Sequence, residues 1–175
     1  MKRRTFLRSM SIVTALTAFG TALSTQSIAR NNNRQISIEP LIKTHKEWHE
    51  LLTPKAYSIL FESHTEKPGS SELNHEHREG TYICAACFLP LFESQYKYDS
   101  GTGWPSFTQP IPGHVNTKPD FKLIFLRTEY HCARCGGHQG HVFDDGPPPQ
   151  GERWCNNGLA LKFVLITDHL PELRE

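Results

Sequence analysis

The chain has 175 residues, enough for one domain or for one domain with a tail. Its hydrophobic content of 37% and charged content of 21% are typical of a globular protein, and they exclude wholesale disorder and a polytopic membrane protein. The 19 basic residues balance 18 acidic ones, but four basic and no acidic residues lie in the first 29 positions, so the rest carries a net charge of −3. Because a nucleic-acid binder needs a basic surface, we expect no nucleic-acid partner.

The N-terminal segment has the pattern of an export signal. Arg3 and Arg4, followed by Phe6 and Leu7, resemble the twin-arginine signal of bacteria. The apolar run over 11–23 is too short and dilute to span a bilayer comfortably, but it suits a signal-peptide core. We therefore expect cleavage after Ala29, a periplasmic protein and no stable membrane association afterwards. An uncleaved membrane anchor is the alternative.

Residues 30–43 are polar, and we predict a flexible linker there, followed by a single domain over 44–175. Thr44 and Glu47 have the spacing of a capping box, which predicts a short helix. Thr53-Pro54 predicts the start of a second one, since a cap and a proline at the first helical position favour helix initiation.

Between the second helix and Gly80 we predict a polar loop. It is rich in acidic residues and histidines, which could bind a metal adventitiously, but we expect only a solvated surface without a role. These residues are Glu62, His64, Glu66, Glu72, His75, Glu76 and His77.

After Gly80 the pattern changes to short apolar segments broken by Gly, Pro and Asp. The clearest predicted strands cover 81–83, 121–126 and 159–165. Strands and helices do not alternate in this part of the sequence, so the fold class is mainly β, antiparallel, with short N-terminal helices.

Two Cys-x-x-Cys pairs, Cys84/Cys87 and Cys132/Cys135, are separated by 44 residues. Together they can complete a tetrahedral shell of four thiolates around one Zn²⁺, and a shell with no open position is structural rather than catalytic. Disulfides are the main alternative, because an exported protein meets an oxidising compartment. A thioredoxin-like redox pair is a third reading, but the βαβ context that it requires is missing.

Cys155 is the fifth cysteine, and the residues around it favour a nucleophile. Arg153 can lower the pKa of a nearby thiol, and a lone cysteine with histidines elsewhere in the chain is a candidate for covalent catalysis. The alternatives are a buried structural thiol for Cys155, and zinc ligation or backbone capping for His138 and His141. Trp104, in a loop rich in glycine, is either a core residue or part of a pocket.

Three segments together resemble the methionine-R-sulfoxide reductase (MsrB) family. They are SGTGWPSF over 100–107, CGGHQGHVFDDGP over 135–147 and RWCNN over 153–157, and the resemblance extends from about Trp48 to Phe163. It implies a β-tent, which is a fold of two antiparallel sheets, with one structural zinc per chain. It also implies that the protein reduces oxidised methionine in peptides and proteins, and that it acts on the R epimer of the sulfoxide, since each of the two epimers has its own enzyme.

The resemblance also implies a role for each site residue. Cys155 is the nucleophile that becomes a sulfenic acid, and Trp104 packs against the methyl group of the substrate. The remaining residues surround the sulfoxide oxygen or support those that do: His138, His141, Asn157, Asp145 and Arg153.

The sequence departs from many relatives at two positions. Thr102 occupies the position of their resolving cysteine, and all other cysteines are assigned to zinc, so we expect an external thioredoxin-like reductant to recycle Cys155 in a monomeric enzyme. Gly158 replaces a serine beside the nucleophile. The rival hypotheses are a non-catalytic zinc-stabilised binding module, a zinc hydrolase and a zinc-bearing nucleic-acid module.

Overall fold

The computed structural model describes residues 38–121 and 127–175. The predicted signal peptide and most of the predicted linker, at 30–37, lie outside the described residues, as do positions 122–126 of the second predicted strand. Within the described ranges, no helix is long and apolar enough to cross a membrane.

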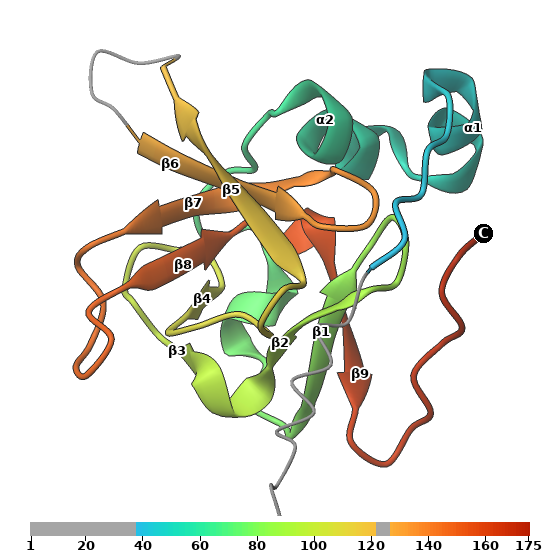
Figure 1. Cartoon of the computed structure of the whole chain (residues 1–175). Helices are drawn as coiled ribbons and strands as arrows, with labels where there is room; N and C mark the ends of the chain where they lie inside the picture. The colour runs from blue at the N-terminus through green and yellow to red at the C-terminus, as the bar shows by residue number, and fades with distance from the viewer. Residues whose placement is uncertain (1–37, 122–126) are drawn as a thin grey trace, which may run out of the picture. The chain divides into compact units, whose positions relative to one another are not determined.

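Two short helices begin the domain, as predicted. α1 (His45–Leu51) starts at Thr44, whose side chain accepts from the Glu47 backbone while the Glu47 carboxylate accepts from the Thr44 backbone, the reciprocal pattern of a capping box. α2 (Pro54–Glu62) is capped by Thr53, whose hydroxyl accepts from the Ala56 N–H. Figure 1 shows α2 beside β7, against which it packs.

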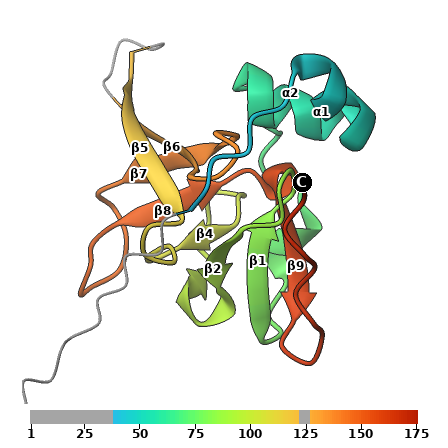
Figure 2. The ribbon, with the colours of Figure 1, turned by 45° about the vertical axis from the view of Figure 1, so that its right-hand side comes forward.

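The rest of the domain consists of two antiparallel sheets, and this confirms the predicted fold class. The smaller sheet has the order β2-β1-β9 and the larger one β3-β4-β8-β7-β6-β5. Figure 2, a turned view, separates β1, β2 and β9 from the strands of the larger sheet. The strands are β1 (Gly80–Cys84), β2 (Pro90–Glu93), β3 (Lys97–Tyr98), β4 (Ser106–Phe107), β5 (Val115–Asp120), β6 (Arg127–Cys132), β7 (His138–Phe143), β8 (Arg153–Asn156) and β9 (Leu161–Leu165). Three short 3-10 helices complete the elements: η1 (Glu72–His75), η2 (Ser94–Tyr96) and η3 (Gly158–Ala160).

Aromatic side chains join the two sheets in the core. Phe107 of β4 is fully buried, stacks on Phe92 of β2 with ring centroids 4.1 Å apart, and meets Tyr82 of β1 edge-on at 4.9 Å. Burial of one such ring stabilises the fold by about 1.5–3 kcal/mol. Because β4 also pairs with β8, this core fixes the strand that carries Cys155.

The structure corrects the predicted element boundaries. Phe121 follows the end of β5 and belongs to no strand, so the predicted strand over 121–126 is wrong at its first residue. The last predicted strand begins at Leu161 rather than 159, because η3 occupies the preceding residues. The loop before Gly80 contains η1.

The end of the predicted linker, over 38–43, has no helix or strand but contacts the domain. Ile38 and Leu41 pack against the core, and the Leu41 N–H donates to the Arg134 carbonyl at 2.7 Å.

Candidate active site

Cys155 lies near the middle of the larger sheet, between two strands that hold it in register. On β8 it pairs with His141 of β7 on one side and with Ser106 of β4 on the other. Side chains directly opposite each other in antiparallel strands lie on the same face of the sheet, with Cβ atoms about 4.5–5.5 Å apart. The pairing therefore makes His141 the cross-strand neighbour of the thiol.

A β-bulge in β7 brings the two predicted histidines together. Tyr130 of β6 pairs with Gly140, but the next residue, His131, pairs with His138, so Gln139 is an extra residue on β7. Residues three apart in a regular strand point to opposite faces, and one extra residue reverses this parity. The His138 and His141 ring centroids are accordingly 5.4 Å apart.

His141 is held by an acid that sequence reasoning did not identify. Its Nε2 lies 2.9 Å from Oδ2 of Asp120, which is buried and also accepts from the Arg127 guanidinium at 2.6 Å. Burial lowers the pKa of His141, and the bond to Asp120 offsets this only in part. The imidazole is therefore neutral at neutral pH.

His138 is more deeply buried than His141. It is 3% exposed, and its Nδ1 lies 2.8 Å from the buried Glu129 carboxylate. Burial alone would raise the pKa of Glu129. The hydrogen bond and charge of His138 lower it, as does Lys118, whose Nζ lies 3.4 Å from Glu129 Oε2, and the net shift is downward.

Arg153 and Asp145 form a bidentate ion pair near Cys155. Arg153 Nε and Nη2 donate to the two Asp145 oxygens at 2.8 and 2.9 Å, and the guanidinium lies 4.3 Å from the centroid of the Phe143 ring. These bonds lower the pKa of Asp145. The pair fixes a positive group next to Cys155.

Burial raises the pKa of the Cys155 thiol, whereas the Arg153 charge and a hydrogen bond from the Thr102 side chain lower it. Burial prevails, so the pKa of Cys155 is raised and the expected depressed pKa is not found. Thr102 therefore lies close to Cys155, and its hydroxyl lies 2.8 Å from that of Ser100.

A cavity of about 120 Å³ opens over Cys155. Four of the predicted site residues line it, whereas His138, Asp145 and Arg153 do not. Its walls are Thr65, Trp104, Arg127, Gly140, His141, Phe143, Cys155, Asn156 and Asn157. An aromatic face, a thiol, a neutral imidazole and an amide therefore converge on one small space.

Asn157 and Trp104 are both fixed from behind the cavity. The Asn157 Oδ1 accepts from the Glu66 N–H at 3.1 Å, and its Nδ2 donates to the Gln139 carbonyl at 3.0 Å. The indole N–H of Trp104 donates to the Glu66 carbonyl at 3.2 Å. Glu66 itself is buried, so the prediction that it lies on a solvated surface is wrong.

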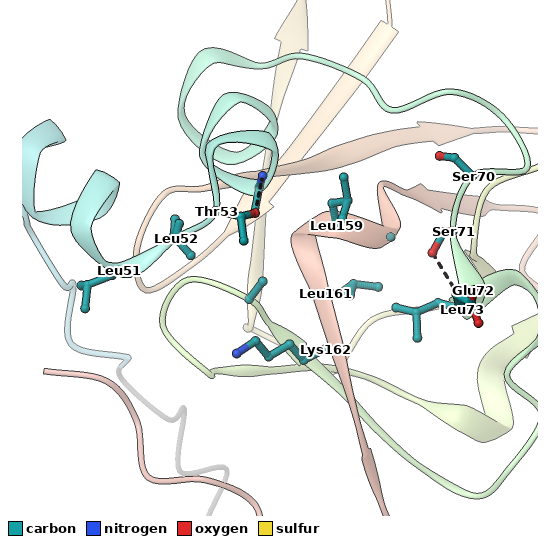
Figure 3. A pocket seen from close by; sticks show the side chains of 13 residues that line it. Leu51, Leu52, Thr53, Ser70, Ser71, Glu72, Leu73, Leu159, Leu161 and Lys162 are labelled. Atoms are coloured by element: carbon teal, nitrogen blue, oxygen red, sulfur yellow. Dashed lines mark hydrogen bonds between the residues drawn. The ribbon is translucent and has the colours of Figure 1, made fainter.

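A second, larger hollow of about 420 Å³ is not lined by Cys155, and Figure 3 shows the side chains around it. Leucines account for most of its apolar lining, and none of the predicted catalytic residues contributes to it. The leucines are Leu51, Leu52, Leu73, Leu159 and Leu161.

The four paired cysteines gather in one cluster, with all four sulfur atoms within 4.8 Å of one another. Cys84 Sγ lies 3.6 Å from Cys135 Sγ, and Cys87 Sγ lies 3.5 Å from Cys132 Sγ. These separations are too long for disulfides, and all five cysteines are free. A Zn–S bond of about 2.3 Å in a tetrahedron implies sulfur separations of about 3.8 Å, so the cluster fits a metal ion.

Sequence reasoning missed four residues around the cysteine: Thr65, Asp120, Arg127 and Glu129. Asp120 of β5 pairs with Arg127 of β6. In the sequence, the only indication of this pair is an acidic residue and a basic residue a few positions apart. Thr65 comes from the loop after α2 and carries no signal of its own.

Residues 52–165 match the family described as the SelR domain. A protein of Bradyrhizobium diazoefficiens named "Peptide methionine sulfoxide reductase MsrB" is 51% identical over 126 residues, which cover 71% of this chain and 91% of that protein. A protein of the same name from Agrobacterium fabrum is 48% identical over 125 residues, 71% of this chain and 93% of the relative.

A plant relative shows similar identity. "Peptide methionine sulfoxide reductase B1, chloroplastic" of Arabidopsis thaliana is 48% identical over 124 residues, which cover 70% of this chain and 61% of that protein. Among solved structures, the Mis18 "Yippee-like" domain aligns with 51% of this chain and 98% of its own at 15% identity and a TM-score of 0.40, a similarity too weak to bear on function.

Proposed function

The chain belongs to the SelR (MsrB) family, and on that premise we propose that it reduces methionine-R-sulfoxide in peptides with Cys155 as the nucleophile. The observation that carries this proposal is the pairing of Cys155 with His141 beneath a small cavity, with Asp120 bonded to the imidazole. A thiol, a base and a carboxylate that orients the base are the parts required for nucleophilic catalysis.

The first step is attack of Cys155 on the sulfoxide sulfur. Because burial keeps the resting thiol protonated and His141 neutral, His141 is suited to accept the thiol proton as the thiolate forms. Asp120 then stabilises the resulting imidazolium, since it accepts a hydrogen bond from Nε2.

The proton next passes from His141 to the sulfoxide oxygen. The bond between the two sulfur atoms then breaks as the protonated oxygen passes from the methionine sulfur to the cysteine sulfur, so the products are methionine and Cys155 sulfenic acid. The sulfur of the substrate is reduced and that of the cysteine oxidised, and the proton that leaves the thiol is the one that protonates the oxygen. No other oxidant or reductant enters this half-reaction.

Asn157 and Trp104 bind the two ends of the sulfoxide group in this proposal. The Asn157 Nδ2 has one N–H bonded to Gln139, and its second N–H is available to the sulfoxide oxygen. The Trp104 ring receives the S-methyl group, because sulfur groups pack favourably on aromatic faces and positive charge on sulfur would add cation–π attraction. Arg153, held by Asp145, and His138 support the site without lining it.

An external thiol completes the cycle. The remaining cysteines are clustered around their own centre, and Thr102 lies beside Cys155. A thioredoxin-like reductant, or dithiothreitol in its place, therefore attacks the sulfenic acid directly, forms a mixed disulfide with loss of water, and resolves it with its second thiol. An intramolecular disulfide at Cys155 after one turnover would refute this cycle.

We also propose that Cys84, Cys87, Cys132 and Cys135 hold one structural Zn²⁺. Four thiolates leave no open position, so the ion would stabilise the fold by joining the β1 and β6 ends and would supply no catalytic chemistry. Metal analysis of the purified chain is expected to give one zinc per monomer.

Export by the twin-arginine route remains a proposal based on the N-terminal sequence. Replacing both Arg3 and Arg4 by lysine is expected to move the protein from the periplasmic to the cytoplasmic fraction of cells that export it. An unchanged distribution would contradict that route.

The function is tested by turnover of a peptide containing methionine-R-sulfoxide, with dithiothreitol as reductant. The whole chain is expected to turn over this peptide but not its S epimer, and Cys155→Ser is expected to abolish turnover while retaining the zinc content. A folded, zinc-loaded wild-type protein that reduces neither epimer would favour a non-catalytic binding module.

A further inference from the structure

Glu66 lies in the loop after α2, and its backbone N–H, its backbone carbonyl and both carboxylate oxygens are hydrogen-bonded. The backbone N–H donates to the Asn157 side chain at 3.1 Å, and the backbone carbonyl accepts from the Trp104 indole at 3.2 Å. Residue 66 thereby connects the two side chains that the proposed mechanism assigns to the sulfoxide oxygen and to its methyl group.

The carboxylate makes a second pair of bonds, to the segment that directly follows Asn157. Oε1 accepts from the Gly158 N–H at 2.6 Å, and Oε2 accepts from the Leu159 N–H at 3.0 Å. These are the first backbone amides of η3, directly after Asn157. Hydrogen bonds from N–H groups to an ionised carboxylate are roughly twice as strong as neutral ones, and Glu66 is only 9% exposed.

The packing leaves this segment little freedom to move. A Cβ atom at Gly158 would lie 1.9 Å from the Ser71 hydroxyl and 3.2 Å from Glu66 Oε1, so the loop lies directly against the backbone of residue 158. Ser71 and Leu159 both line the apolar hollow (Figure 3). Glu66 therefore lies between the hollow and the catalytic cavity and fastens one wall of the cavity.

These contacts also determine which atoms Asn157 presents. The Glu66 N–H requires an oxygen opposite it, and the Gln139 carbonyl requires an N–H, so together they fix the orientation of the amide. An inverted amide would place a donor against a donor at Glu66. With the observed orientation, the free N–H of Asn157 is a donor for an oxygen that carries negative charge.

We infer that Glu66 is a positioning residue of the active site, which holds Asn157 and Trp104 at a fixed separation so that they bind the sulfoxide group together. This inference rests on the proposed function. Glu66 does not bond to Cys155, so it acts on the substrate side of the reaction and leaves the reactivity of the thiol unchanged.

The test is Glu66→Gln, with Glu72→Gln as the matched control. The glutamine side chain has nearly the same shape, but its NH₂ group would face a backbone N–H, so one of the two amides loses its acceptor. Glu72 is exposed on η1, and the same substitution there alters no contact of the cavity. Since displacements of about 1 Å at a reacting group can cost about 100-fold, we expect Glu66→Gln to lower kcat/KM at least about tenfold.

Two further readouts separate positioning from a general loss of structure. The rate at which iodoacetamide alkylates Cys155, measured against pH, is expected to match the wild type in Glu66→Gln, as is the zinc content. If Glu66→Gln does not fold, Glu66→Asp keeps the charge but shortens the side chain by one methylene, and it is expected to show a smaller loss of kcat/KM with the same alkylation profile.

The inference is overturned if folded Glu66→Gln retains the wild-type kcat/KM, or if activity and Cys155 alkylation fall together. A wild-type enzyme that does not turn over the R-sulfoxide peptide would instead refute the proposed function, which the same assay measures separately.

Discussion

Replacing Gly140 by alanine tests whether the register between β7 and β8 sets the catalytic geometry. Gly140 pairs with Asn156, and a Cβ atom there would lie 1.9 Å from the Cys155 carbonyl oxygen and 2.9 Å from its carbonyl carbon. Both are backbone atoms, so rotation of a side chain cannot relieve the contact.

The size of the effect follows from these distances. Carbon–oxygen contacts between strands are ordinarily about 3.3–3.6 Å, so the Cys155 backbone must retreat by about 1.4 Å. β8 resists this, because Cys155 also pairs with Ser106 and the Asn156 N–H donates to the Pro105 carbonyl at 2.9 Å. A shift of about 1 Å can cost about 100-fold in rate, and overpacking costs about 1–3 kcal/mol of stability.

We therefore expect Gly140→Ala to lower kcat/KM about 100-fold on the R-sulfoxide peptide. The melting temperature is expected to fall by about 2–12 °C, at about 2–4 °C per kcal/mol. Gly113→Ala is the control: nothing lies within 4 Å of its added Cβ, and its φ of +78° confines the penalty to backbone strain of about 1 kcal/mol. An unchanged kcat/KM for Gly140→Ala would refute the reasoning.

Three further predictions concern the thiol, the metal centre and the missing resolving cysteine. Because burial raises the pKa of Cys155 and lowers that of His141, and the thiol proton is the one that reaches the sulfoxide oxygen, kcat/KM is expected to be constant around pH 7 and to fall by up to about tenfold per unit above the thiol pKa; a steady rise with pH would contradict this. Arg134 Nη1 donates to the Cys87 carbonyl at 3.4 Å and to the Arg174 carbonyl at 2.5 Å. Arg134→Ala is therefore expected to speed zinc release to a chromogenic chelator about tenfold, because these bonds support a predicted zinc ligand. An unchanged rate would show that these bonds do not retain the metal. Thr102→Cys is expected to form an intramolecular disulfide with Cys155 after one turnover, seen by mass spectrometry, because the Thr102 side chain lies close to the thiol; a persistent sulfenic acid would contradict it.

The parts of the fold that follow local rules were predictable from sequence. The capping box at Thr44 and the proline at the start of α2 are local signals, and both helices begin where expected. The two Cys-x-x-Cys pairs predicted a common centre, since few other arrangements use such spacing. The antiparallel class followed from short strands without intervening helices.

The supporting residues depend on tertiary contacts that have no local signature. Asp120 reaches His141 only through the β5–β6–β7 pairing, and the two histidines share a face only because Gln139 is bulged out of register. Glu66 illustrates the opposite error. In the sequence it belongs to a charge-rich loop, but more than 90 residues separate it from the amides that bury its carboxylate.

The chemical state of Cys155 after a single turnover is the most direct test of a one-cysteine mechanism. The whole chain is mixed with excess R-sulfoxide peptide without any reductant, the reduced peptide is counted per chain, and Cys155 is trapped with dimedone. We expect one equivalent of reduced methionine and dimedone on Cys155, with the other four cysteines unchanged. A disulfide that includes Cys155, or methionine formation without modification of Cys155, would contradict this mechanism.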